Sequence, residues 1–171
     1  MKPEELTPLI QAFFQHKLTI AFAESCTAGL LASELSKATG SSEVLLGGVV
    51  TYHPDAKQRL LGVKKETLEL YSAESQQVTN EMAMGLHKHL PADVCVAVTG
   101  LCGSGASESP DKPVGTAFIT ILHQHKAHEY RQVFDTTGEE MKQEIVDFVF
   151  QKLQGLVGQV PDMLPTRTSR K

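Results

Sequence analysis

Apolar residues along the chain recur at two spacings, one typical of helices and one typical of strands. Six segments have helical spacing or helical character, and they are residues 6–16, 30–37, 56–61, 63–71, 75–90 and 139–156. Five shorter segments have the alternation or the continuous apolar run of strands, and they are residues 17–23, 44–52, 93–98, 115–124 and 127–134. The pattern therefore predicts helices alternating with strands, followed by a hairpin and a last helix.

This order of elements predicts the fold class. Strands that are separated by helices favour parallel pairing, whereas the two strands of the predicted hairpin must be antiparallel. We expect an α/β fold, a three-layer helix/sheet/helix sandwich with a mixed sheet. No repeat or linker interrupts the pattern, so we expect a single domain over residues 1–158. Residues 159–171 are rich in polar residues and proline, and we expect them to be a mobile tail.

Composition narrows the choice of partners and location. The chain has 171 residues, a net charge of −4 and a pI near 6.0, a balance that does not favour a nucleic-acid or anionic membrane surface. No apolar run approaches the roughly 20 residues that a membrane span needs. Residues 1–5 are charged and are not followed by the apolar stretch of a secretory signal. An odd count of three cysteines suits a reducing compartment, so we expect a cytoplasmic protein.

The first candidate for chemistry is the polar turn Ala23-Glu24-Ser25-Cys26-Thr27-Ala28-Gly29, which joins a predicted strand to a predicted helix. A serine on such a turn exposes its hydroxyl beside N–H groups that favour an anion or an oxyanion. The structural alternative is that Ser25 or Thr27 only caps the helix. Cys26 competes with Ser25 as a nucleophile, but neighbouring side chains point in different directions and most buried cysteines are structural.

Two further segments follow predicted strands and should lie near this turn. In open α/β sheets, ligands bind beyond the carboxyl ends of the strands. The segment Thr99–Gly105 contains Gly100, Gly103 and Gly105, which would let backbone approach a ligand closely, although it could equally be a flexible turn. Tyr52 and Lys57 flank the start of a predicted helix, and a lysine in a partly closed cleft acts as a base. The alternative for Lys57 is an ordinary solvated side chain.

The histidines do not form a convincing metal site. Two residues of a strand that are two positions apart share a face, which makes His123 and His125 the only pair with suitable geometry. No cysteine or carboxylate cluster accompanies them in the sequence. We therefore expect no metal and no cofactor.

Three motifs in a fixed order resemble those of the CinA C-terminal domain family. Residues 23–29 are similar to the family's AESCTGG signature, and residues 49–57, Val-Val-Thr-Tyr-x-x-x-Ala-Lys, are similar to its second motif. Residues 99–106 resemble its third motif, Thr-Gly-Ile-Ala-Gly-Pro-Gly-Gly, and are followed by Lys112-Pro113-Val114-Gly115-Thr116. The order and spacing of the motifs agree from about residue 5 to residue 153.

The resemblance implies a nicotinamide mononucleotide deamidase, an amidohydrolase that releases nicotinic acid mononucleotide and ammonia. It implies that Ser25 is the nucleophile and that Tyr52 and Lys57 transfer its proton, with either of them as the immediate base. It also implies a small nucleotide as the substrate, no cofactor, and a homo-oligomer. The residues expected to hold the oxyanion or the substrate are Cys26, Thr27, Ala28, Gly29, Thr99, Gly100, Gly103, Ser104 and Gly105.

The chain departs from the family pattern at several positions. Ala28 stands where glycine is usual, and Cys102 stands where alanine is usual. The family's Phe-x-Gly-Asp-Arg before the last helix is replaced by residues 134–140, which lack the arginine. The candidates to take its place are Lys112 and Arg131. Two alternatives follow, a catalytically weak nucleotide-binding module of the same fold and an amidase that acts on a different small amide.

Overall fold

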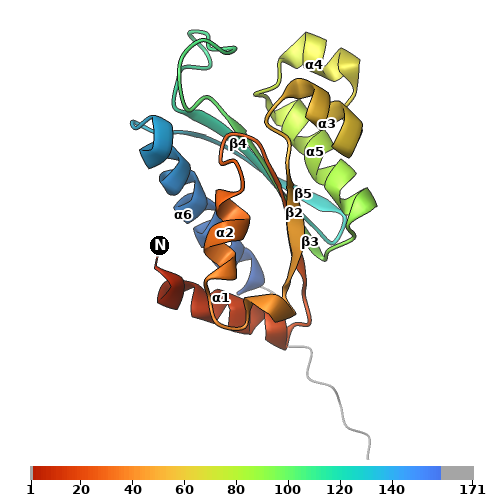
Figure 1. Cartoon of the computed structure of the whole chain (residues 1–171), viewed down its shortest axis with the longest axis vertical. Coiled ribbons are helices and arrows are strands. Elements are labelled where there is room, and N and C mark those ends of the chain that lie inside the picture. The colour runs from red at the N-terminus through yellow and green to blue at the C-terminus, as the bar shows by residue number, and fades with distance from the viewer. Residues whose placement is uncertain (1, 159–171) are drawn as a thin grey trace, which may run out of the picture.

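A computed structural model describes residues 2–158, in which five strands form one sheet (Figure 1). The strands are β1 (Ile20–Glu24), β2 (Leu45–Val50), β3 (Val94–Gly100), β4 (Thr116–His123) and β5 (Lys126–Val133). They lie in the order β2-β1-β3-β4-β5. β1 is parallel to β2 and β3, whereas β4 is antiparallel to β3 and β5. The predicted mobile tail at residues 159–171 lies outside the described residues.

Helices cover both faces of this sheet (Figure 1). One face carries α1 (Pro3–Gln15), α2 (Leu30–Ser36) and α6 (Gly138–Val157). The other face carries α3 (Pro54–Leu61), α4 (Lys65–Tyr71) and α5 (Gln76–His89), while a short 3-10 turn, η1 (Ser41–Glu43), precedes β2. The predicted three-layer sandwich with a mixed sheet is confirmed. Among residues 2–158, no helix has the length and apolar character needed to cross a membrane.

Side-chain size on β1 explains why the two helical layers differ. Ile20 and Phe22 pack into the larger core with α1, α2 and α6, whereas Ala21 and Ala23 face α5. Small side chains on that face let α5 approach the sheet closely. Gly85 of α5 in turn lies against α3, where a Cβ atom at this position would be 1.9 Å from the carbonyl oxygen of Leu61. Backbone contact therefore fixes α3 on α5.

Some predicted boundaries were wrong because of local backbone geometry. The first strand begins at Ile20 rather than at Lys17, because Lys17 adopts a left-handed φ of 55° that no strand continues. The second strand ends at Val50, before the predicted end at Tyr52. These shifts leave the order of elements unchanged.

The connections bring three segments to one edge of the sheet. The chain leaves β1 through α2 on one face and returns from β2 to β3 through α3, α4 and α5 on the other face. The carboxyl ends of β1, β2 and β3 are therefore followed by residues 25–29, 51–53 and 101–106 at the same edge. This change of face is the place where α/β sheets bind ligands.

Candidate active site

Ser25 and Lys57 are in direct contact at this edge. The Ser25 N–H donates to the carbonyl of Val98 at 3.1 Å, so that the residue extends the pairing of β1 with β3. The Lys57 Nζ donates to the Ser25 Oγ at 2.7 Å and to the Thr51 carbonyl at 2.5 Å. Lys57 is only 1% exposed. The solvated alternative for Lys57 is therefore wrong.

The start of α3 positions Lys57. Pro54 occupies the first turn, and the His53 Nδ1 accepts a hydrogen bond from the Asp55 N–H at 3.1 Å. Lys57 follows in the same helix, and its side chain reaches the Ser25 hydroxyl and the Thr51 carbonyl. Burial lowers the pKa of Lys57 to about 8. The negative charges of Glu74 and Cys26 raise this pKa, but by less than burial lowers it. A lysine with this pKa supplies a neutral amine near neutral pH. Such an amine is able to accept the proton of a serine hydroxyl.

Glu24, rather than Ser25 or Thr27, caps α2. Its buried carboxylate accepts hydrogen bonds from the N–H groups of Gly29, Leu31 and Ala32, all at 3.0 Å. The capping alternative for Ser25 and Thr27 is therefore wrong, and the carboxylate already fills the positive end of this helix. This role of Glu24 was not predicted from the sequence, although the glutamate directly precedes Ser25 in the same turn.

The predicted oxyanion donors separate into two groups. The Ala28 N–H donates to the Ser25 carbonyl at 3.0 Å, and the Gly29 N–H is held by Glu24. Within residues 2–158, the N–H groups of Cys26 and Thr27 donate to no other residue, and the Cys26 N–H interacts only with its own sulfur. These two groups adjoin the Ser25 hydroxyl in the chain. They are the donors that this turn offers to an oxyanion.

A cavity of about 220 Å³ lies over Ser25. Its lining comes from the Ser25 turn, the segment after β2, the segment before α5, the end of β3 and the glycine loop, which we define as residues 101–106. The lining residues are Ser25, Cys26, Tyr52, Glu74, Gly100, Leu101, Cys102, Gly103, Ser104, Gly105 and Ala106. The structure thus brings together residues of all three predicted segments.

Several predicted residues lie elsewhere. Thr27, Ala28 and Gly29 do not line this cavity. Thr99 does not line it either, because its hydroxyl is buried against α5, where it lies 2.8 Å from the Thr79 hydroxyl. The period of two along β3 turns Thr99 toward α5. The Thr99 hydroxyl therefore does not face the cavity over Ser25, which gives no support to a side-chain contact with a substrate there.

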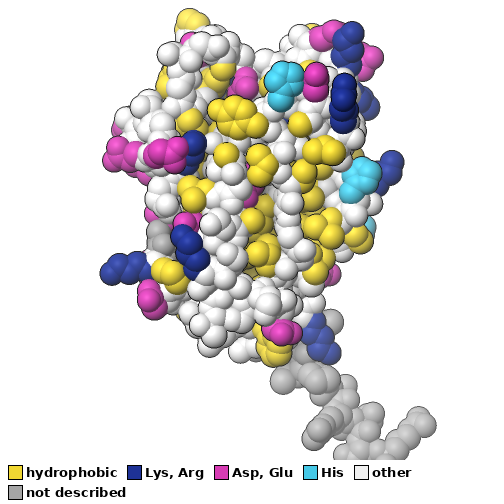
Figure 2. All heavy atoms as spheres, viewed as in Figure 1, with side chains coloured by type: hydrophobic (Ala, Val, Ile, Leu, Met, Phe, Trp, Pro, Cys, Tyr) yellow, Lys and Arg dark blue, Asp and Glu magenta, His cyan; other side chains and the backbone are white. Residues whose placement is uncertain are grey.

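Tyr52 occupies the rim of the cavity. Its side chain is 68% exposed and no hydrogen bond joins it to Ser25 or Lys57 in the described part of the chain. β2 is an edge strand, and Figure 2 shows hydrophobic side chains gathered along the middle of the face on which it lies. Of the two candidates for the base, Lys57 is the one that contacts the Ser25 hydroxyl.

The cations near the glycine loop differ in what they contact. Lys112 donates to the Ser72 hydroxyl, the Glu74 carbonyl and the Ser107 hydroxyl, at 2.6, 2.9 and 2.8 Å. Arg131 donates to the carbonyl of Asp111. Neither residue lines the cavity, and the described contacts of both are with protein groups.

Lys142 is a cation that the sequence analysis missed. The first residue of α6, Gly138, donates its N–H to the Cys102 carbonyl at 2.7 Å, which places the start of this helix beside the glycine loop. Lys142 lies one turn further along and interacts electrostatically with Cys102 and Tyr52. Its Nζ is 2.5 Å from the Glu139 carboxylate. No local pattern marked Lys142, because its position depends on the packing of α6.

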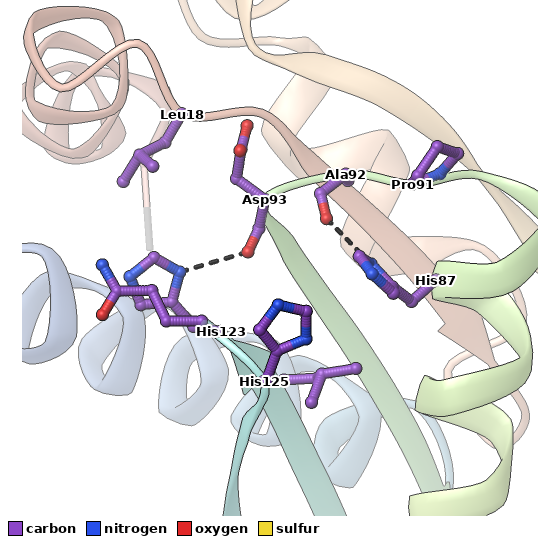
Figure 3. A pocket seen from close by; sticks show the side chains of 9 residues that line it. Leu18, His87, Pro91, Ala92, Asp93, His123 and His125 are labelled. Carbon is purple, nitrogen blue, oxygen red and sulfur yellow. Dashed lines mark hydrogen bonds between the residues drawn. The ribbon is translucent and has the colours of Figure 1, made fainter.

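A second cavity, of about 250 Å³, lies at the opposite end of the sheet (Figure 3). His123 and His87 lie within hydrogen-bond distance of the carbonyls of Asp93 and Ala92, at 3.1 and 3.2 Å. His125 lies in the β4–β5 turn with a φ of 62°, and Figure 3 shows its ring near His87 rather than beside His123. The strand geometry assumed for a His123–His125 metal pair was therefore wrong. No group of three potential metal ligands occurs among residues 2–158.

Comparisons with known proteins identify the family of this chain. Residues 5–157 match the family model of the CinA C-terminal domain. The chain is 44% identical over 124 residues to a CinA-like protein of Thermotoga neapolitana, which covers 72% of this chain and 30% of that protein. It is 38% identical over 156 residues to a CinA-like protein of Petrotoga mobilis, which covers 91% of this chain and 38% of that protein. The chain thus spans about a third of the length of these relatives.

Solved structures show the same fold. The competence damage-inducible protein A (ComA) of Klebsiella pneumoniae superposes with a TM-score of 0.87 at 28% identity, covering 94% of this chain and 99% of that one. The competence/damage inducible protein CihA of Agrobacterium tumefaciens superposes with a TM-score of 0.84 at 35% identity, covering 92% and 96% of the two chains. The three-layer architecture is thus shared with these proteins.

Proposed function

Because the chain belongs to the CinA C-terminal domain family, we propose that it is a serine amidohydrolase acting on nicotinamide mononucleotide. The observation that carries the proposal is the 2.7 Å hydrogen bond from the buried Lys57 amine to the Ser25 hydroxyl. A serine becomes a strong nucleophile when an adjacent group of suitable pKa removes its proton. The family resemblance supplies the substrate.

The geometry supports a two-step hydrolysis. Ser25 Oγ attacks the carboxamide carbon while its proton moves to Lys57 Nζ, and the N–H groups of Cys26 and Thr27 stabilise the oxyanion. Lys57 returns the proton to the amide nitrogen, the C–N bond breaks, and ammonia leaves an ester on Ser25. Water then attacks this ester and gives a proton to Lys57, which passes it to Ser25 Oγ as the bond between Oγ and the acyl carbon breaks. The products are the carboxylate, nicotinic acid mononucleotide, and the free enzyme.

The glycine loop and Lys142 would receive the nucleotide portion. The N–H groups of Gly105 and Ala106 donate to the Glu108 carboxylate at 2.7 and 2.9 Å, which shows that these donors converge on one anionic group. A phosphate that displaces Glu108 would meet the same donors. Lys142 adds a positive charge on the side of Cys102 and Tyr52.

The same carboxylate favours a second candidate function. Glu108 fills the donors that a phosphate would need, and Glu139 and Glu140 begin α6 beside the glycine loop. An uncharged small amide would bind there without displacing Glu108. A catalytically weak nucleotide-binding module stays the remaining alternative, and it predicts binding without turnover.

Ammonia release tests the proposal. The assay compares three proteins, the wild type, Ser25→Ala and the control Ser42→Ala. Ser42 is exposed and does not line the cavity. Each protein is given the mononucleotide and, separately, its dephosphorylated nucleoside. We expect turnover by the wild type and by the control and none by Ser25→Ala. Preference for the nucleoside would favour the second candidate, whereas calorimetric binding without turnover would favour the binding module.

We further infer a cytoplasmic homo-oligomer. Leu46 and Val50 of the edge strand β2 are about half exposed, which supports contact with a second copy. Sedimentation velocity on the full chain tests the oligomer, and a monomer at all concentrations would contradict it.

A further inference from the structure

Two cysteines from distant parts of the sequence meet at the wall of the candidate active site. Cys26 directly follows Ser25, and Cys102 belongs to the glycine loop, yet both line the same cavity. The thiols share a hydrogen bond, and both side chains join the same apolar cluster under α6. A Cβ atom at Gly100 would be 3.1 Å from the Cys26 Sγ, so the sulfur of Cys26 lies against the backbone from which the glycine loop starts.

The environments of the two thiols differ. Cys26 is buried, and its hydrogen bond to Cys102 together with burial raises its pKa well above the usual value. The same hydrogen bond lowers the pKa of Cys102, and the charge of Lys142 lowers it further, against the effects of burial and Glu139. Cys102 is half-buried and opens to the cavity. A small oxidant therefore reaches Cys102 more easily than it reaches Cys26, and Cys102 forms a thiolate more readily than Cys26 does.

Cys95 provides an internal comparison. It is buried between β3 and the end of α5, where its Sγ lies 3.8 Å from the Ala92 carbonyl and 3.9 Å from the Leu90 carbonyl. Burial raises its pKa to about 11. It has no cysteine beside it and does not line the cavity over Ser25.

We propose that Cys26 and Cys102 form a peroxide-responsive dithiol that closes to a disulfide in the wall of the candidate active site. The formation of this disulfide is independent of the proposed function, whereas its effect on amide hydrolysis rests on that function. Disulfides in a reducing compartment are characteristically transient and responsive, which fits a pair at the surface of a cavity.

The chemistry balances with hydrogen peroxide as the oxidant. The Cys102 thiolate attacks one peroxide oxygen, the O–O bond breaks, and Cys102 becomes a sulfenic acid while hydroxide leaves. The Cys26 sulfur then attacks the Cys102 sulfur, the S–O bond breaks, and the Cys26 proton leaves with the hydroxyl as water. Together, two thiols and one peroxide give one disulfide and two waters. An external dithiol reverses the reaction by exchange.

The disulfide would join the turn that carries the nucleophile to the glycine loop, which also lines the cavity. A sulfur–sulfur bond holds two Cα atoms about 4.4–6.8 Å apart, so the glycine loop would lose its freedom to adjust around a substrate. The bond would also lie directly beside Ser25 and the Cys26 N–H. We therefore expect oxidation to reduce turnover reversibly.

Thiol counting and mass spectrometry test the proposal without an activity assay. The full-length protein is treated with hydrogen peroxide, and we expect free thiols to fall from three to one, with the loss of two hydrogen masses and a tryptic Cys26–Cys102 cross-link. Dithiothreitol should restore three thiols. Cys95→Ala should still lose two thiols, whereas Cys102→Ala and Cys26→Ser should form no intramolecular cross-link.

Two outcomes would overturn the proposal. One is a sulfinic acid at Cys102 while Cys26 still titrates as a free thiol, and the other is a cross-link that includes Cys95. Turnover is measured on the same samples. In the wild type and in Cys95→Ala, it should fall in proportion to the fraction of protein that carries the Cys26–Cys102 cross-link. If the reduced protein does not hydrolyse the mononucleotide, the proposed function fails, while the cross-link remains measurable.

Discussion

Lys57 Nζ lies 2.7 Å from Ser25 Oγ, although 32 positions of the sequence separate the two residues. Ser25 is held by the pairing of β1 with β3, and Lys57 is held by α3, which rests on α5 through Gly85. The contact therefore depends on packing between the sheet and one helical layer. A shift of α3 should therefore change the distance between the Lys57 Nζ and the Ser25 Oγ.

The pH dependence of hydrolysis should report the ionisation of Lys57. Burial lowers the pKa of this lysine to about 8, so the neutral amine that removes the Ser25 proton becomes more abundant as the pH rises through 8. We expect kcat/KM to rise through this range and then to level off. A profile that is flat between pH 6 and pH 9 would contradict the role of Lys57.

Lys57→Arg is the matched variant for this profile, because guanidinium keeps its proton at every accessible pH. It should lose nearly all turnover and show no ascending limb. Substrate binding measured by calorimetry should be retained to a greater extent than turnover, which separates loss of the base from loss of the cavity.

The stability of the protein should also depend on the ionisation of Lys57, with a definite sign. The folded pKa of about 8 lies below the ordinary lysine pKa of 10.5, so between these values the unfolded chain binds more protons than the folded one. The contribution of Lys57 to the free energy of unfolding therefore rises as the pH increases from about 8 to 10.5, and this gain is absent below pH 8. Relative to Lys57→Met, the wild type should gain about 2 kcal/mol in free energy of unfolding between pH 8 and pH 9.5. Urea titrations at both pH values measure the difference, and equal changes in the two proteins would contradict it.

Most of the fold was predictable, because the period of two and the helical spacing are local properties of the sequence. The position of Ser25 at a sheet edge followed from the strand–turn–helix order. Thr99 shows where motif similarity was insufficient, since the alternation along β3, with Val96 and Val98 in the larger core and Ala97 in the smaller one, already placed it on the α5 side. Lys142 could not be predicted, because its place beside the cavity arises from how α6 packs.

The role of Glu24 also required the structure. Replacing this residue by glutamine should destabilise the Ser25 turn, because a neutral amide turns one NH2 group toward the N–H donors of Gly29, Leu31 and Ala32. Loss of charge-assisted hydrogen bonds in a buried place costs about 1.5–3 kcal/mol. Glu66→Gln, at an exposed position in the first turn of α4, is the control and should change stability by less than about 0.5 kcal/mol. Thermal and urea unfolding measure both, and equal effects would argue against the cap.

Gly85→Ala tests whether the contact between α5 and α3 positions Lys57. The new Cβ would lie 1.9 Å from the Leu61 carbonyl oxygen, so α3 must shift. We expect a loss of about 1–3 kcal/mol in stability and a fall in kcat that exceeds the change in KM. Gly155→Ala places the same methyl group in α6, where nothing lies within 4 Å, and should stabilise the helix by about 0.5–1 kcal/mol. Normal kcat in a folded Gly85→Ala protein would show that the lysine does not depend on this contact.

Lys142→Ala tests whether this lysine binds the phosphate of the substrate. Lys142 pairs with Glu139 three residues earlier at 2.5 Å, and Lys37 forms the same kind of pair with Glu34 at 2.6 Å on α2, which makes Lys37→Ala the matched control. A charge-assisted hydrogen bond contributes about 1.5–3 kcal/mol, so loss of Lys142 should raise KM for the mononucleotide roughly ten- to a hundredfold. The dephosphorylated nucleoside should show no such change, and neither should Lys37→Ala with either substrate. If KM rises equally for the nucleotide and the nucleoside, Lys142 supports the cavity without contacting the phosphate.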